Sequence, residues 1–310
     1  MDQDCRYCQV VNPQEANFCM YCGKALVPPG QLPDNSRVVI TGMGVVSPLG
    51  VTLAQNWEAL LAGKSGVGRM TGIPNAERYP CNYSSEVKDF DPKNYMDHKS
   101  ARRMTEASQY AVASARMAYE DAGLEPTNMD PSRSGVVIGT AGGNSIVETE
   151  RAMRKMINKQ RISPIRFNSV WPNMAAFAIA RDFNCAGYNG TIVTACASGT
   201  QSLATAADAI RLGYVDMVIA GGTESLNSEV ALAGFSGIGA LSQCKDEPQK
   251  ASRPFDQNRD GLIPGEGAAM LVLENLAHAK ARGARVYAEI LGYAVAVSYT
   301  HLRAHETNPC

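Results

Sequence analysis

The sequence lacks several features that would assign it to common classes of protein. Its 310 residues carry a formal net charge of -1, so there is no basic excess to suggest a nucleic-acid partner. It contains no apolar run long enough to cross a membrane. The first residues, Met1–Cys8, are polar and acidic, and no secretory signal is visible. We therefore expect a cytoplasmic protein that binds neither nucleic acid nor membrane.

A dinucleotide-binding signature is also missing. The glycine-rich turn Ala141-Gly142-Gly143 follows an apolar stretch, but neither the Gly-x-Gly-x-x-Gly order nor the acidic residue that should follow it is in place. We expect no cofactor for catalysis. The hydrophobic content of 45% and the length indicate one large or two ordinary globular domains.

Cysteine is plentiful, and four of the nine cysteines form two Cys-x-x-Cys pairs, Cys5 with Cys8 and Cys19 with Cys22. Each pair can curl into a knuckle that aims two thiolates at one point, and two knuckles complete a tetrahedral zinc site. A disulfide or a redox Cys-x-x-Cys are the alternatives, but a redox motif needs a βαβ context that is absent here. The stretch resembles a small bacterial zinc ribbon, predicted for residues 1–26. Its four-cysteine shell leaves no open position, so the zinc would be structural or serve partner binding.

A linker is predicted for residues 27–36, where Pro28, Pro29, Gly30 and Pro33 cluster. The second domain is expected to span residues 37–297.

Apolar strand-like runs alternate with helix-like runs through this second domain, which predicts an α/β core whose sheet carries helices on both faces. The expected strands are Arg37–Val46, Ser134–Thr140, Thr191–Ala195, Asp216–Ala220, Ala268–Leu273 and Arg285–Gly292. The expected helices are Thr52–Leu61, Arg103–Leu124, Asn173–Asp182, Ser198–Leu212 and Asn275–Arg282.

Cys196 is the candidate catalytic residue, because it falls where a predicted buried strand, Thr191–Ala195, gives way to a helix. The positive end of that helix dipole favours a thiolate, which is the nucleophilic form of cysteine. The small residues at 197–199 would let a substrate carbonyl approach the sulfur and free backbone N–H groups. From this pattern alone, Cys196 is equally compatible with a buried, inert cysteine.

Several motifs in order resemble the β-ketoacyl-acyl-carrier-protein synthases, in particular the elongating type II enzymes of fatty-acid synthesis and their polyketide relatives. These motifs are Thr41-Gly-Met-Gly-Val-Val-Ser-Pro48, Thr194-Ala-Cys-Ala-Ser-Gly199, Gly221-Gly-Thr-Glu224, Arg253-Pro-Phe-Asp256, Arg259-Asp-Gly261 and Gly265-Glu-Gly267. The resemblance covers Arg37 to about Tyr293.

The resemblance implies a thiolase-like fold with layers α-β-α-β-α, of which this chain holds mainly the N-terminal half, and a homodimer. It implies that Cys196 takes an acyl group from acyl-carrier protein as a thioester. Malonyl-acyl-carrier protein would then lose carbon dioxide, and the resulting carbanion would attack that thioester. The Cys196 backbone N–H would form part of the oxyanion hole.

The second half of the family's catalytic machinery is not found in this chain. The family uses two histidines and a lysine to drive decarboxylation, with one histidine in a His-Gly-Thr motif that does not occur here. His98 and His278 are expected on solvated faces, and His301 and His305 receive no role. They lie where the family pattern stops, and residues 298–310 are interpreted as a non-family, artefactual tail. The chain is therefore expected to be a truncated acyltransferase that is inactive in condensation.

Two other functions compete with this hypothesis. The first is a non-catalytic, synthase-like partner or scaffold that docks another protein through its zinc ribbon. Inactive partners usually lose the nucleophile, whereas Cys196 is present. The second is a biosynthetic thiolase, which the Arg259-Asp-Gly261 and Gly265-Glu-Gly267 motifs disfavour.

Overall fold

The computed structural model describes residues 3–5, 9–13, 19, 26, 32–74, 76–244 and 247–294 of the chain. The linker predicted for residues 27–36 is described only from residue 32. The tail predicted for residues 298–310 lies outside the described residues, and so do His301 and His305.

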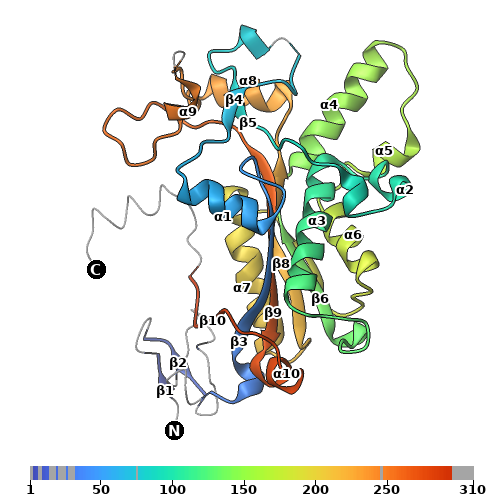
Figure 1. The fold of residues 1–310 in the computed structure, drawn as a ribbon, viewed down its shortest axis with the longest axis vertical. Coiled ribbons are helices and arrows are strands. Elements are labelled where there is room, and N and C mark those ends of the chain that lie inside the picture. Colours follow the sequence, from blue (N-terminus) through green and yellow to red (C-terminus); the bar gives the residue numbers. More distant parts are fainter. Residues whose placement is uncertain are drawn as a thin grey trace.

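A six-stranded mixed sheet forms the centre of the molecule (Figure 1). From one edge to the other its strands are β10 (Ala288–Ile290), β3 (Val38–Val46), β9 (Glu266–Asn275), β8 (Met217–Ser225), β6 (Ser134–Gly139) and β7 (Asn189–Ile192). Strands β7, β6 and β8 are parallel, while β9 runs antiparallel to both β8 and β3. Two smaller ladders pair β1 (Gln3–Asp4) with β2 (Val11–Asn12) and β4 (Val67–Arg69) with β5 (Tyr83–Ser85).

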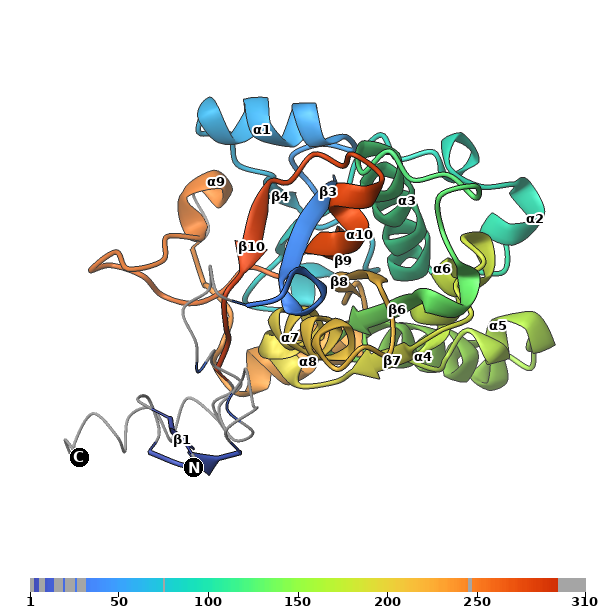
Figure 2. The same ribbon diagram turned by 90° about the horizontal axis from the view of Figure 1, so that it is seen from below.

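Helices cover both faces of this sheet, as the sequence predicts. The helices of the described residues are α1 (Leu53–Leu61), α2 (His98–Ala101), α3 (Glu106–Asp121), α4 (Gly143–Ile157), α5 (Pro164–Asn168), α6 (Met174–Asp182), α7 (Ser198–Arg211), α8 (Glu229–Gly237), α9 (Pro248–Ala251) and α10 (Leu276–Ala281). Figures 1 and 2 show α3 and α6 on one face and α7 on the other. None of the helices within the described residues combines the length and apolar character that crossing a bilayer requires.

Local signals account for most of these elements. The side chain of Thr52 accepts a hydrogen bond from the Gln55 backbone and begins α1, and Asn275 begins α10 in the same way through His278. Helices α2, α4, α5, α8 and α9 are not among the helices that the sequence predicts. The glycine-rich turn at Ala141-Gly142-Gly143 leads into α4, and its Gly142 is the N-cap with φ of +106°, a conformation that suits glycine.

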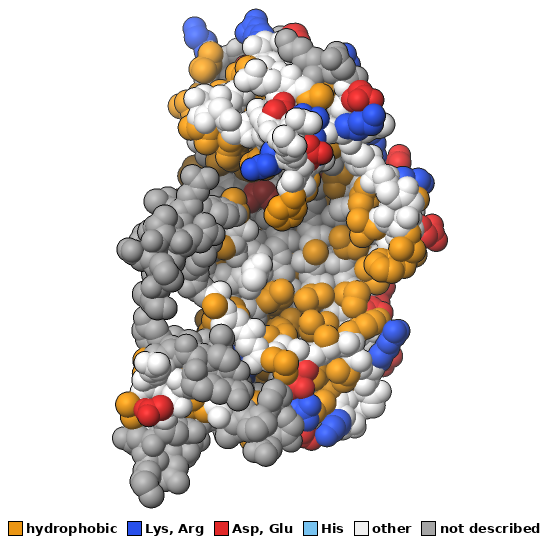
Figure 3. Space-filling view, turned by 90° about the vertical axis from the view of Figure 1, so that its left-hand side faces the viewer, with side chains coloured by type: hydrophobic (Ala, Val, Ile, Leu, Met, Phe, Trp, Pro, Cys, Tyr) orange, Lys and Arg blue, Asp and Glu red, His pale blue; other side chains and the backbone are white. Residues whose placement is uncertain are grey.

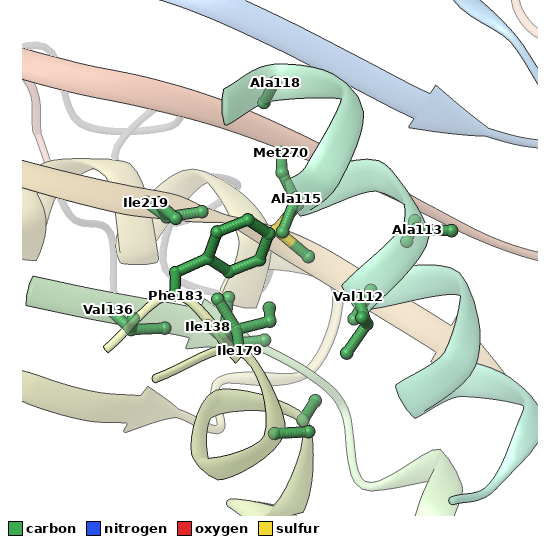
Figure 4. Packing of buried hydrophobic residues seen from close by; sticks show 14 of the residues in the cluster. Val112, Ala113, Ala115, Ala118, Val136, Ile138, Ile179, Phe183, Ile219 and Met270 are labelled. Atoms are coloured by element: carbon green, nitrogen blue, oxygen red, sulfur yellow. The ribbon is translucent and has the colours of Figure 1, made fainter. Parts of the chain in front are cut away.

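The α3 face of the sheet is closely packed. Ala107, Ala111, Ala115 and Ala118 of α3 are buried, and their small side chains let the helix lie near the strands. A Cβ atom on Gly42 of β3 would lie 2.2 Å from the Ala118 carbonyl oxygen, so only glycine fits there. Figure 4 shows the apolar side chains of β6, β8 and β9 directed toward α3 and α6.

The α7 face is covered less completely. Its core cluster is smaller and is centred on the buried side of α7. Apolar side chains gather over a hollowed part of this face of the molecule (Figure 3). Val193, which directly follows β7, is 52% exposed, and Leu212, at the C-terminal end of α7, is 67% exposed. Contiguous exposed apolar surface of this kind marks a face that another structure covers.

A buried ionic cluster joins β9, α10 and β3 at the end of the sheet opposite the carboxyl ends of the parallel strands. Glu274 is fully buried, and Arg282 donates to its two carboxylate oxygens at 2.8 and 2.5 Å. His278 Nδ1 lies 2.5 Å from the same carboxylate, and the Thr41 hydroxyl donates to it. Burial alone would raise the pKa of Glu274, but the hydrogen bonds from Arg282, His278 and Thr41 outweigh it and lower that pKa to about 2.

This cluster predicts a specific acid sensitivity. Because the pKa of Glu274 lies below its ordinary value of 4.5, the ionised carboxylate stabilises the fold above about pH 4.5, and this contribution is lost as the pH falls toward about 2. Glu274→Gln should lower the free energy of unfolding at neutral pH by about 3 kcal/mol, since it leaves Arg282 buried without its counter-charge. Urea unfolding followed by circular dichroism at a series of pH values measures both effects.

Glu247→Gln is the matched control, because the Glu247–Lys250 pair is largely exposed and should contribute less than about 0.5 kcal/mol. Equal losses in the two variants would contradict the role given to the cluster.

Candidate active site

The candidate site lies at the end of the sheet where the parallel strands β6, β7 and β8 have their carboxyl ends. The carboxyl ends of parallel strands lie at the same end of a sheet. This places together Thr140 after β6, Cys196 after β7 and Glu224 near the end of β8. Cys196 sits in a short 3₁₀ turn, Ala195–Ala197, directly before α7. The predicted position of Cys196 between a strand and a helix is confirmed.

The predicted burial of the strand before Cys196 is wrong. The strand ends at Ile192 rather than Ala195, and β7 is an edge strand whose residues are exposed or half-buried. Cys196 is itself exposed. The reason is that β7 pairs on one side only, with β6, so its apolar residues are not enclosed by the sheet.

The exposure of Cys196 also contradicts the alternative that it is a buried, inert cysteine. Cys185 shows what such a residue looks like in this chain. It is 9% exposed, and burial raises the pKa of its thiol to about 12. Cys196 instead lies open to solvent at the N-terminal end of a 14-residue helix.

The backbone before Cys196 is strained. Ala195 has φ of +50°, the left-handed region that a non-glycine residue enters at a cost of about 1–2 kcal/mol. Such conformations persist only where the surroundings hold them, and they cluster at functional sites. The turn therefore presents Cys196 in a geometry that the chain would not adopt by itself.

The expectation that residues 197–199 leave open space for a substrate holds only in part. Ala197 is exposed, but the Ser198 side chain is buried and Gly199 packs against β8. A Cβ on Gly222 of β8 would lie 3.1 Å from the Gly199 Cα, and a Cβ on Gly139 of β6 would lie 2.2 Å from the Ser198 carbonyl oxygen. These small residues serve mainly to bring the N-terminus of α7 onto the sheet.

Glu224 is a site residue whose contribution sequence reasoning missed. Its carboxylate accepts a hydrogen bond from the Ala141 backbone at 2.6 Å and one from the Thr140 hydroxyl at 3.3 Å. It thereby fixes the loop that joins β6 to α4 beside the turn that holds Cys196. The Gly221–Glu224 motif singled out Glu224 in the sequence, but it did not indicate that Glu224 contacts the loop at Thr140 and Ala141.

No histidine lies beside Cys196 in the described part of the chain. His98 is exposed at the start of α2, as expected. The prediction of a solvated face is wrong for His278, which is only 24% exposed and contacts Glu274. Because β9 is antiparallel to β8, Glu274 and His278 lie at the end of the sheet opposite to Cys196.

Two of the four predicted zinc ligands fall within the described residues. Cys5 is fully buried and Cys19 is 3% exposed, while Cys8 and Cys22 lie outside the described residues. The Cys5 amide donates to the Val10 carbonyl at 3.0 Å, and the Cys5 carbonyl accepts from the Gln9 amide at 2.8 Å, next to the pairing of β1 with β2. Gln9 takes the left-handed conformation, with φ of 58°. Among the described residues, no group of three or more histidine, cysteine or acidic side chains is placed to hold a metal ion, and the zinc ribbon stays a prediction.

Comparison with solved structures shows that this chain has the mixed α/β fold of ketosynthases. The ishigamide ketosynthase/chain length factor matches with a TM-score of 0.75 at 36% identity, over 83% of this chain and 62% of that one. A type II polyketide ketosynthase solved in complex with its acyl-carrier protein matches with a TM-score of 0.71 at 31% identity, over 85% of this chain and 64% of that one.

The sequence comparisons define the family. The beta-ketoacyl synthase N-terminal domain matches residues 35–279. The chain is 43% identical over 270 residues to the 3-oxoacyl-acyl-carrier-protein synthase 2 of Coxiella burnetii, which covers 87% of this chain and 65% of that protein. The chain therefore belongs to the beta-ketoacyl synthase family, and it spans about 65% of the length of the curated relatives it matches.

The close approach of α7 to β6 can be tested with Gly139→Ala. The added methyl group would meet the Ser198 carbonyl at 2.2 Å and the Gly199 nitrogen at 2.6 Å, so we expect a loss of about 2 kcal/mol or more in the free energy of unfolding. Urea unfolding measures this loss.

Gly234→Ala in α8 is the control, since a Cβ there has no neighbour within 4 Å among the described residues. Alanine favours a helix over glycine, so this variant should be unchanged or slightly more stable. A Gly139→Ala protein as stable as the Gly234→Ala protein would contradict the packing described here.

Proposed function

We propose that this chain is the N-terminal part of a β-ketoacyl-acyl-carrier-protein synthase, with Cys196 as its nucleophile. The observation that carries the proposal is the exposed thiol on a strained turn at the N-terminus of α7, in a chain of this family. Acyl-carrier protein and malonyl-acyl-carrier protein are the proposed partners. The similar polyketide ketosynthase solved with its acyl-carrier protein supports this choice.

The geometry suits the first half of the reaction. The Cys196 sulfur would attack the carbonyl carbon of an acyl thioester, and the carrier thiolate would leave and take a proton. Negative charge develops on the carbonyl oxygen in the transition state, and the partial positive charge at the N-terminus of α7 lies next to Cys196 to stabilise it. The Cys196 backbone N–H is the proposed oxyanion-hole donor.

The second half of the reaction needs groups beyond those described. Malonyl-carrier protein would lose carbon dioxide, and its carbanion would attack the Cys196 thioester to form the carbon–carbon bond and release the sulfur. Among the described residues the histidines are His98, which is exposed on α2, and His278, which lies at the end of the sheet opposite to Cys196. The chain alone is therefore proposed to be inactive in condensation.

The uncovered α7 face supports a thiolase-like arrangement in the full-length protein. The relatives extend beyond the length of this chain, and a second α/β half would bury the apolar surface in Figure 3 to give the layers α-β-α-β-α. A homodimer and a cytoplasmic location complete the proposal.

The N-terminal residues 1–26 are proposed to form a zinc ribbon ahead of a linker at 27–36 and the synthase domain at 37–297. The burial of Cys5 and Cys19 and the pairing of β1 with β2 support it. Zinc held by Cys5, Cys8, Cys19 and Cys22 would stabilise a segment with too little apolar content to fold alone.

Replacement of the nucleophile tests the enzymatic proposal. In the full-length gene product, Cys196→Ala should lower the rate of ketoacyl product formation by about a thousandfold or more and abolish acylation of the cysteine by acyl-carrier protein. Product formation is followed by mass spectrometry of the carrier-bound acyl chain.

Cys244→Ala, which removes a half-exposed cysteine outside the site, should keep the rate of the unsubstituted enzyme. Unimpaired elongation by Cys196→Ala would contradict the proposal. An inactive full-length enzyme that still binds a partner would favour the scaffold hypothesis.

The zinc site predicts metal content directly. The chain expressed with zinc should contain about one zinc ion per molecule, and Cys5→Ser should lose it because three thiolates bind zinc far less tightly. Plasma emission spectroscopy of the purified protein measures the ratio, with Cys244→Ser as the control. A chain that lacks zinc, or a Cys5→Ser variant that retains it, would contradict the ribbon.

A further inference from the structure

Ser198 is a buried serine that contacts both ends of the turn that carries Cys196. Its side chain is at the first position of α7, and the residue is 3% exposed. The Thr194 amide donates to the Ser198 hydroxyl oxygen at 2.8 Å. The same oxygen lies 2.7 Å from the Ala195 carbonyl oxygen and 3.1 Å from the Thr140 carbonyl oxygen, so it can donate to either of them.

These contacts form a bracket around the nucleophile. Thr194 and Ala195 precede Cys196 and Ser198 follows it, so the hydroxyl closes a loop of five residues with the thiol near its middle. Residues 193–197 are all exposed, which leaves the turn with little apolar packing to hold it. The left-handed φ of Ala195 nevertheless has to be maintained.

We propose that Ser198 is a positioning residue for Cys196. Its hydroxyl holds the Thr194 amide and the Ala195 carbonyl in the conformation that keeps the Cys196 sulfur in front of the N-terminus of α7. The inference rests on the nucleophilic role proposed for Cys196, and it assigns Ser198 no contact with substrate.

The bracket is anchored to a second loop through Thr140. The Thr140 carbonyl is within reach of the Ser198 hydroxyl, and the Thr140 amide donates to Ile192 O at 3.0 Å. Glu224 holds Thr140 and Ala141 in turn. The hydroxyl of Ser198 therefore lies where the nucleophile turn meets the loop between β6 and α4.

Ser202 provides a matched comparison on the same helix. It is fully buried, and its hydroxyl oxygen lies 2.7 Å from the carbonyl oxygens of both Gly199 and Gly221. It thus ties α7 to β8 with the same chemistry as Ser198, four residues further along. It has no hydrogen bond to the turn that holds Cys196 among the described contacts.

The test measures the reactivity of Cys196 in the 310-residue chain. Ser198→Ala and Ser202→Ala are alkylated with iodoacetamide over a series of pH values, and the rate at Cys196 is read by peptide mass spectrometry. Ser198→Ala should slow alkylation of Cys196 about tenfold and change its pH profile, because small displacements of a reacting group have effects of this size or larger. Ser202→Ala should stay within about twofold of the unsubstituted chain, and the rate at Cys244 should not change in either variant.

A second measurement is independent of reactivity. Hydrogen exchange at the Thr194 amide should accelerate in Ser198→Ala but not in Ser202→Ala, because only Ser198 accepts that hydrogen. Equal alkylation rates and pH profiles in the two variants, with equal exchange at Thr194, would overturn the proposal. Failure of the proposed function would show differently, as elongation that survives Cys196→Ala in the full-length protein.

Discussion

The close contact between the N-terminus of α7 and the strands β6 and β8 is the constraint on which the site depends. Gly139, Gly199 and Gly222 meet there, and the backbones approach so closely that a Cβ on Gly139 would fall 2.2 Å from the Ser198 carbonyl oxygen. Because the helix is held this near the sheet, the turn before it has little conformational freedom. The left-handed Ala195 and the exposed Cys196 follow from that geometry.

The two faces of the sheet show how differently one sheet can be completed. On the α3 side, an alanine stripe and glycines in β3 give a finished interface. On the α7 side, the helix is packed along one flank, and apolar surface stays open around it. Cys196 lies next to this less covered face, directly before the first residue of α7.

Local chemistry made much of the fold predictable from sequence. The caps at Thr52 and Asn275 and the continuous apolar strands were assigned from residue type and spacing, and so was the strand-to-helix position of Cys196. Burial was less predictable, because it depends on which strand lies at the edge, and β7 lies there. His278 was misplaced for a similar reason, since its partner Glu274 sits on the preceding strand rather than on the helix itself. The roles of Ser198 and Glu224 depend on contacts between loops far apart in the sequence, which no local pattern encodes.

The order of the strands has a consequence for synthesis on the ribosome. All six strands of the sheet come from residues between Val38 and Ile290, so the sheet can close as soon as that stretch has emerged. From then on the emerging protein would display the open face beside α7 until another structure covers it, and such exposed apolar surface is what chaperones recognise.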